Sequence, residues 1–341
     1  NWEQLLRALY NKPLYQKPAL GSPPAFIEDI ARPSLPTIGK FGLLKDAILN
    51  ARPGVTLARR DFLDAAIDYA DSFRVRKAPE VPHIDEKVLA DLHSLLPMRD
   101  QLVDWLMLES VAPSPQFDDV LIDLLEKILA LKYRPSEISQ GQDGWFDAHG
   151  IFVYEMFLYV VAALLAAGRD HTLKLVLSTQ YLLPEEERHR DGGLASYDEF
   201  FTYASSLAAR KSRLKLNRIS LIADIIKERA TRKDIPFRDI MQAELVVLLV
   251  TLLSENTRWY PHTLVYAGHG GMKFPFFVRA AQHRYFERIK LITGIETGDE
   301  LRQKFMEGCS RHEVGRWEGL RFWANVSFPD AMSLEALDTV K

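Results

Sequence analysis

Cysteine is almost absent from this chain of 341 residues. Cys309 is the only one, so no intrachain disulfide can form, and this usage suits a reducing compartment. The beginning of the sequence also lacks the basic and apolar regions of a secretory signal peptide. We therefore predict a cytoplasmic protein.

Long apolar runs are scarce as well. The longest, Ile151–Ala167, contains Glu155 and is followed by Gly168 and two charged residues. A membrane-spanning helix needs about 20 consecutive apolar residues. We therefore predict that this run forms a buried core helix and that the protein has no membrane partner.

The common catalytic and metal-binding motifs are missing. The nine histidines show no HxxxH or HExxH spacing, and one cysteine cannot build a structural zinc site. No GxSxG motif is present. Cys309 has positive neighbours that could stabilise a thiolate, but a half-buried cysteine at a helix end is the simpler interpretation. We predict no catalytic residue, no metal site and no cofactor in this chain.

The pattern of apolar residues is helical over most of the sequence. Hydrophobic residues make up 47% and charged residues 26% of the chain, which is ordinary for a globular protein. Apolar side chains recur with helical spacing at 121–128, 219–226 and 278–292. Further helices are predicted at 56–73, 84–111, 145–167, 195–209, 237–254 and 296–306.

Strand signals are few. The best is Trp259–Ala267, but Pro261 restricts it to an edge strand or an extended loop. Strands and helices do not alternate, which disfavours a parallel sheet. We predict a mainly α protein, an irregular multi-helix body with at most a short extended or hairpin element near 258–275. Two helical lobes are expected, at 38–140 and 141–341.

Charge is distributed unevenly along the chain. The overall net charge is −3, yet residues 1–150 hold 17 basic and 22 acidic side chains, whereas residues 205–293 hold 16 basic and 7 acidic ones. A positive segment among negative ones can focus an electrostatic potential. We call residues 205–293 the basic block.

The basic block contains our candidate ligand contacts. Arginines with interleaved aromatic residues suit phosphate-bearing ligands such as nucleotides or single-stranded nucleic acid. The alternative is that these arginines pair with the acidic N-terminal half, within the chain or across an oligomer. The candidates are Arg213, Arg218, Arg258, Tyr260, His262, His269, Arg279, Arg284 and Arg288.

A glycine-rich turn lies inside the basic block at 268–271. Its backbone N–H groups could cradle a phosphate ahead of a helix that begins near Pro275. The GxGxxG and GxxxxGK[ST] patterns are absent, so the sequence favours a plain loop.

The first 26 residues combine a short apolar stripe with a proline-rich exit. Four prolines between positions 13 and 24 prevent a helix from continuing. We expect residues 1–37 to hold the terminal helix of a preceding domain followed by a linker. The stripe consists of Trp2, Leu5, Leu6 and Leu9.

This opening and the segment Arg258–Ile295 resemble the C-terminal edge of bacterial TIR and SEFIR domains and the helical regions that follow them in multidomain immune proteins. The resemblance implies an upstream TIR-like domain that degrades NAD in anti-phage defence, so NAD would be the substrate of that domain. This chain would then be a regulatory sensor or oligomerisation module, a homo-oligomer that responds to a phage-derived or nucleotide trigger. Two alternatives stay open: a helical nucleotide- or nucleic-acid-binding module that uses the basic block, and a helical enzyme whose site only the fold reveals.

Overall fold

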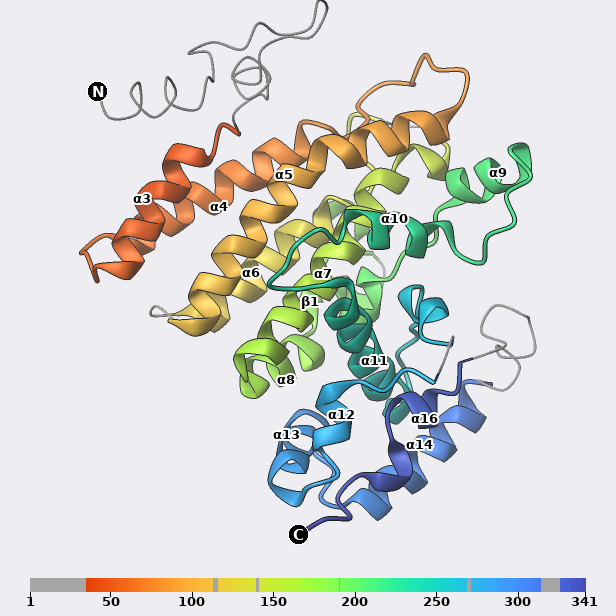
Figure 1. Cartoon of the computed structure of the whole chain (residues 1–341). Coiled ribbons are helices and arrows are strands. Elements are labelled where there is room, and N and C mark those ends of the chain that lie inside the picture. Colours follow the sequence, from red (N-terminus) through yellow and green to blue (C-terminus); the bar gives the residue numbers. More distant parts are fainter. Residues whose placement is uncertain (1–34, 113–115, 139–140, 190, 269–270, 314–325) are drawn as a thin grey trace, which may run out of the picture.

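Helices form nearly all of the regular structure (Figure 1). The computed structural model describes residues 35–112, 116–138, 141–189, 191–268, 271–313 and 326–341. The predicted helix with Trp2, most of the predicted linker and His269 lie outside these residues. Within them, the predicted mainly α fold is confirmed.

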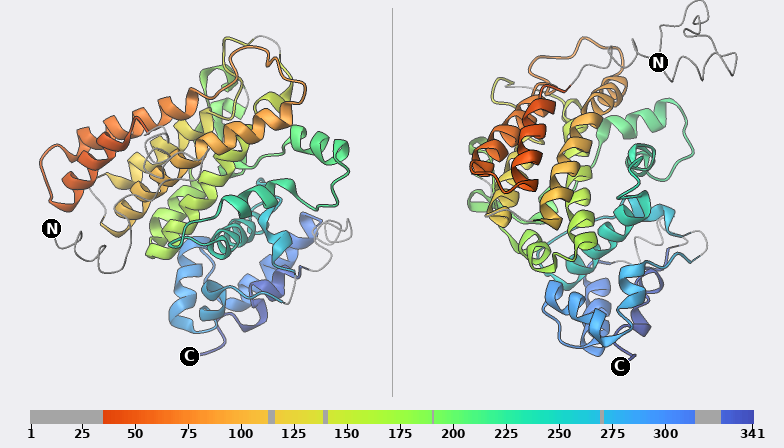
Figure 2. Two further views of the ribbon diagram at one scale, coloured as in Figure 1. Left: turned by 45° about the horizontal axis from the view of Figure 1, so that its top comes forward. Right: turned by 60° about the vertical axis from the view of Figure 1, so that its left-hand side comes forward.

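The described residues form thirteen α-helices that range from 4 to 28 residues in length. The helices are α3 (Ile38–Leu49), α4 (Val55–Asp71), α5 (Ile84–Val111), α6 (Phe117–Ala130), α7 (Asp147–Ala167), α8 (Asp170–Ser178), α9 (Ser205–Arg213), α10 (Leu221–Arg229), α11 (Phe237–Leu253), α12 (Pro275–Arg279), α13 (His283–Thr293), α14 (Gly298–Arg311) and α16 (Phe328–Ala331). The α3–α4 hairpin lies at one end of the molecule, and the C-terminal helices lie at the other (Figures 1 and 2).

Helix α7 is the centre of the core. Every residue from Asp147 to Leu165 is buried, and α5 and α11 both pack against this helix. Among the described residues, α7 is the one helix that is long and apolar enough to cross a membrane. Here protein surrounds it, as expected for a core helix.

The buried apolar residues form one cluster that draws on both predicted lobes. Leu102 of α5, Leu125 of α6, Phe157 of α7 and Leu248 of α11 all belong to it. The boundary near residue 140 stays a prediction.

The small β element is not where the sequence predicted it. The two-stranded antiparallel pair is β1 (Tyr181–Leu182) with β2 (Leu194–Ala195). In the described part of 258–275, a 3₁₀ turn, η5 (Thr263–Tyr266), and the start of α12 occur instead. Pro261 has no N–H to donate to a strand partner, so the aromatic signal of this segment reflects burial rather than pairing.

Two predicted helices also differ from the structure. The stretch 195–209 begins with a strand and a 3₁₀ turn, and only Ser205–Arg213 is α-helical. The predicted stripe at 278–292 is divided between α12 and α13. The backbone N–H groups of Asp338 and Val340 donate to the carbonyls of Ala280 and Ala281, so a distant segment takes the acceptors that a continuous helix would use.

Candidate functional site

An apolar pocket of about 550 Å³ lies between α9, α10 and the segment 260–265. A volume of this size, with mostly apolar walls and a few polar groups, is typical of small-molecule sites. Its polar groups are Lys211, Ser220, His262 and the hydroxyls of two tyrosines. The remaining lining residues are Phe201, Tyr203, Ala204, Leu207, Ala208, Ile219, Leu221, Ile222, Tyr260, Pro261 and Val265.

Two structural features hold the walls of this pocket in place. Ser220 is the N-cap of α10, and its hydroxyl oxygen accepts a hydrogen bond from the N–H of Ala223 at 3.2 Å. On the opposite wall, the ring of Phe201 stacks on that of His262, with a centroid separation of 5.3 Å and an interplanar angle of 7°. Both features fix the orientation of groups that face the pocket.

His262 is held at both ring nitrogens. Its Nε2 lies 3.0 Å from the carbonyl oxygen of Thr202, and its Nδ1 lies 3.1 Å from the Oγ of Ser220. Because a carbonyl only accepts hydrogen bonds, Nε2 carries the proton in the neutral ring, and the Ser220 hydroxyl donates to Nδ1. Burial lowers the pKa of His262, although the charge of Glu244 and the contact with Thr202 act in the opposite direction.

Glu244 of α11 anchors the segment that carries His262. This fully buried carboxylate accepts hydrogen bonds from the N–H of His262 at 2.9 Å, the N–H of Thr263 at 2.7 Å and the indole of Trp259 at 3.2 Å. The hydroxyl of Tyr154 on α7 also donates to it. A carboxylate with this many donors compensates its loss of hydration, so the segment rests on the core rather than on surface loops.

The mouth of the pocket exposes aromatic and aliphatic surface. Tyr203 is 70% exposed, Ile219 45% and Tyr260 37%. Lys211 at the same mouth reaches towards the carbonyl of Ile219 at 3.5 Å. An exposed apolar patch beside a cavity marks a surface that binds another molecule.

At least seven of the sixteen basic side chains of the basic block form ion pairs with carboxylates of the same chain. Arg210 and Arg213 of α9 both pair with Asp85 and Glu86 at the start of α5, for example at 2.8 Å between Arg210 and Asp85. This is the pairing with the acidic N-terminal half that the sequence left open. Further ion pairs are Arg218–Asp224, Arg229–Glu155, Arg232–Asp104, Arg232–Asp234, Arg288–Asp170 and Lys290–Glu296.

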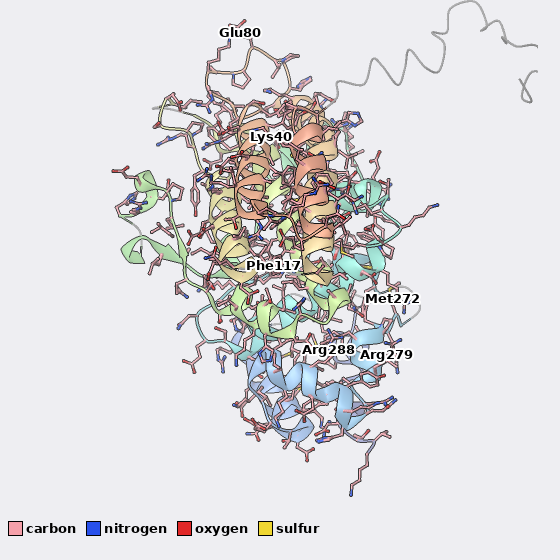
Figure 3. The ribbon with its side chains drawn as sticks, turned by 90° about the vertical axis from the view of Figure 1, so that its left-hand side faces the viewer. Lys40, Glu80, Phe117, Met272, Arg279 and Arg288 are labelled. Carbon is pink, nitrogen blue, oxygen red and sulfur yellow. The ribbon has the colours of Figure 1, made fainter. Side chains whose placement is uncertain are left out.

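Two of the candidate arginines meet at a second, smaller cavity. Arg279 and Arg288 both line a space of about 220 Å³ between α7, α11, α12 and α13, near the C-terminal helices in Figure 3. Arg288 is bound at 2.7 Å by both carboxylate oxygens of Asp170 and lies 5.1 Å from the ring centroid of Phe276. Its charge is therefore already balanced.

The structure thus divides the candidate ligand contacts. Tyr260 and His262 belong to the apolar pocket, whereas Arg279 and Arg288 belong to the smaller cavity. Arg284 stacks on the neighbouring ring of Tyr285 at 4.6 Å. Arg258 lies before Trp259, and its backbone N–H donates to Asp198.

Sequence reasoning missed Ser220 and Thr202, which are 42 and 60 positions from His262. The only local signal was a serine ahead of an apolar helical stripe, which predicts an N-cap. Nothing in that pattern indicates a histidine partner, because the contact joins three segments that are separate in the sequence.

Comparisons with protein-family models, with curated proteins and with solved structures find no match to this chain. The site must therefore be interpreted from its own geometry.

Proposed function

We propose that this chain is a regulatory sensor module whose ligand enters the apolar pocket. The observation that carries the proposal is a pocket of about 550 Å³ whose walls are almost entirely apolar, with an exposed aromatic mouth and few polar groups. Such a site suits a ligand with a flat or branched apolar body and one polar end.

The wider setting comes from the resemblance to regions that follow TIR-type domains. In that setting the module controls an upstream NAD-degrading domain in cytoplasmic anti-phage defence. Ligand binding or self-association would bring the enzyme domains together, since tethering raises their effective concentration. If this chain alone catalysed the loss of NAD, the assignment of regulation to this chain and of catalysis to an upstream domain would be wrong.

Filling the pocket tests the sensor proposal. The probe is anilinonaphthalene sulfonate, whose fluorescence increases in apolar surroundings and which carries one anionic group. Ala208→Trp places an indole where Ala208 lines the cavity, and we expect its affinity for the probe to fall at least about tenfold, which corresponds to about 1.4 kcal/mol.

Ala209→Trp is the matched control, because Ala209 is the next residue of α9, is exposed and does not line the cavity. Circular dichroism checks that both variants fold. If wild type does not bind the probe, or if both variants weaken binding equally, the pocket is not the ligand site.

The alternative proposal is a nucleotide- or nucleic-acid-binding module. The internal ion pairs of Arg213 and Arg288 count against it, because paired arginines release fewer counterions on binding phosphates. A titration of single-stranded oligonucleotide or nucleotide at rising salt distinguishes the two proposals. Tight binding that falls steeply with salt would favour the alternative.

A further inference from the structure

We propose that the pocket is also a site of acyl transfer, with Ser220 as nucleophile and His262 as general base towards carboxylic esters that have an apolar acyl group. This rests on the proposed function, because the same pocket must first admit the ligand. The starting observation is a serine and a histidine that hydrogen-bond to each other at 3.1 Å and both line the apolar pocket described above.

The hydrogen bonds assign the role of each ring nitrogen. The carbonyl of Thr202 holds the proton on Nε2, which leaves the lone pair of Nδ1 directed at the Ser220 hydroxyl. A base that is oriented by a third group and contacts the nucleophile is the geometric signature of nucleophilic catalysis. Here the roles of Nδ1 and Nε2 are exchanged relative to the usual serine protease arrangement.

The surroundings favour proton transfer in the required direction. Burial lowers the pKa of His262, which favours the neutral ring that can accept a proton. When it becomes an imidazolium, the carboxylate of Glu244 provides a nearby opposite charge. The ring therefore has both a neutral resting form and stabilisation of its charged form.

Negative charge would develop at the beginning of α10. The N–H of Ala223 already donates to the Ser220 oxygen at 3.2 Å, and this helix of nine residues adds the positive end of its dipole. Leu221 and Ile222 occupy the first two helical positions, where N–H groups have no acceptor inside the helix. Their N–H groups are the candidate donors to the oxyanion of a tetrahedral intermediate.

The walls define the substrate class. Apart from Lys211 at the mouth and the catalytic His262, the lining has no ionisable side chain other than tyrosine, so the acyl group must be apolar, and its size is limited by the cavity. In the first step the Ser220 oxygen bonds to the carbonyl carbon and the ester C–O bond breaks, while the hydroxyl proton moves through His262 to the leaving alkoxide. Water then attacks the carbonyl carbon of the acyl-serine and gives a proton to His262. The bond between that carbon and the Ser220 oxygen breaks, His262 returns the proton to this oxygen, and the carboxylic acid is released.

Another serine of the same chain serves as a control for a purely structural role of Ser220. Ser327 is the N-cap of α16, and its hydroxyl oxygen accepts from the N–H of Asp330 at the same 3.2 Å. In the described structure no histidine is hydrogen-bonded to Ser327. A comparison of the two serines therefore distinguishes the effect of helix capping from that of activation by an imidazole.

The experiment is active-site labelling with an alkyl fluorophosphonate, followed by intact mass measurement and peptide mapping. We expect one adduct per chain, on Ser220, and a labelling rate that falls about 100-fold or more in His262→Gln. Ser327→Ala should be labelled at the wild-type rate. Ser220→Asn keeps a good N-cap residue and should give no adduct.

Each result bears on a defined claim. A wild-type protein that binds the probe but forms no adduct on Ser220 overturns the acyl-transfer proposal and leaves the binding proposal standing. Labelling of Ser220→Asn at the wild-type rate overturns it as well. Failure of both binding and labelling overturns both proposals.

Discussion

Gly308 lies where α14 crosses the end of α11, and the contact leaves no room for a side chain. A Cβ atom at this position would lie 1.8 Å from the carbonyl oxygen of Leu252, far inside any van der Waals contact. We expect Gly308→Ala to lower the free energy of unfolding by about 1–3 kcal/mol, because the two helices must separate. Urea denaturation followed by circular dichroism measures this change.

Gly42 in α3 is the matched control for that substitution. It is also a helical glycine, but a Cβ built on it has nothing within 4 Å. Gly42→Ala should raise stability by about 0.5–1 kcal/mol through the higher helix propensity of alanine. Equal effects of the two substitutions would contradict the packing of α14 on α11.

His149 makes stability depend on pH at the residue scale. It is buried in α7 with its Nε2 2.9 Å from the carbonyl oxygen of Ala70, and burial lowers its pKa to about 4. Since an unfolded histidine titrates near 6.5, the unfolded state binds more protons between these values. The stabilisation is complete above about pH 6.5 and is lost as the pH falls towards about 4, by about 3 kcal/mol.

His149→Gln should flatten this part of the pH profile, because glutamine can still donate to Ala70 but does not titrate. The measurement is the free energy of unfolding at several pH values between 4 and 7. His262, whose pKa is also lowered, should account for a remaining slope. An unchanged slope in His149→Gln would show that this histidine is not buried in its neutral form.

At the scale of elements, one buried carboxylate joins three helices. Glu155 of α7 binds Arg99 of α5 at 2.7 Å and Arg229 at the end of α10 at 2.8 Å. Burial alone would raise the pKa of Glu155, but the charges of Arg229 and Arg99 together lower it. The carboxylate is therefore ionised and fixes α10, one wall of the pocket, to the core.

We expect Glu155→Gln to lower the free energy of unfolding by about 3–5 kcal/mol, because the buried guanidinium of Arg229 loses its carboxylate partner and that of Arg99 keeps only its pair with Asp100. The exposed pair between Asp64 of α4 and Lys127 of α6, at 2.6 Å, is the control. Asp64→Asn should cost less than about 1 kcal/mol, since water screens this pair. Comparable losses in the two variants would contradict the burial of Glu155.

The elements themselves were predictable to different degrees. Helix α5 begins and ends at the predicted residues 84 and 111, and α11 differs from its predicted range by one residue, because long apolar periodicity depends only on local sequence. Helices α3 and α8 were not predicted. The division between α12 and α13 was also missed, since it depends on hydrogen bonds from Asp338 and Val340.

At the scale of the whole molecule, the α3–α4 hairpin has four large apolar side chains that are exposed to solvent. Ile38, Leu43 and Leu49 of α3 and Leu57 of α4 are between 53% and 69% exposed. Together with the proposed oligomeric role, this predicts a sedimentation coefficient that rises with protein concentration in analytical ultracentrifugation. Leu43→Glu should weaken the association at least about tenfold, because a charge would have to be desolvated in the interface.

Leu175 of α8, which is 38% exposed and lies on another helix, provides the control. Leu175→Glu should leave the concentration dependence unchanged. A monomer at all concentrations, or equal effects of the two substitutions, would remove the hairpin as the oligomerisation surface.

The candidate site was only partly accessible from the sequence. Tyr260 and His262 were selected for their residue types and their place in the basic block, and both line the pocket. Ser220 was not selected, because its contact with His262 joins residues that lie 42 positions apart in the sequence. Of the arginines chosen for phosphate contacts, Arg213 forms internal ion pairs, and Arg279 and Arg288 line a separate cavity. The sequence alone does not show which carboxylate lies near each arginine in the folded chain.

Local sequence by itself determined the helical class, the burial of Ile151–Leu165 and most helix positions, because periodicity and propensity act over a few turns. Tertiary structure alone decided which arginines meet carboxylates and which side chains share a cavity. Those outcomes depend on contacts between 201–211, 219–222 and 260–265. The geometry of such contacts is set by packing on other helices, since α9 packs on α5 and the segment that carries His262 packs on α11.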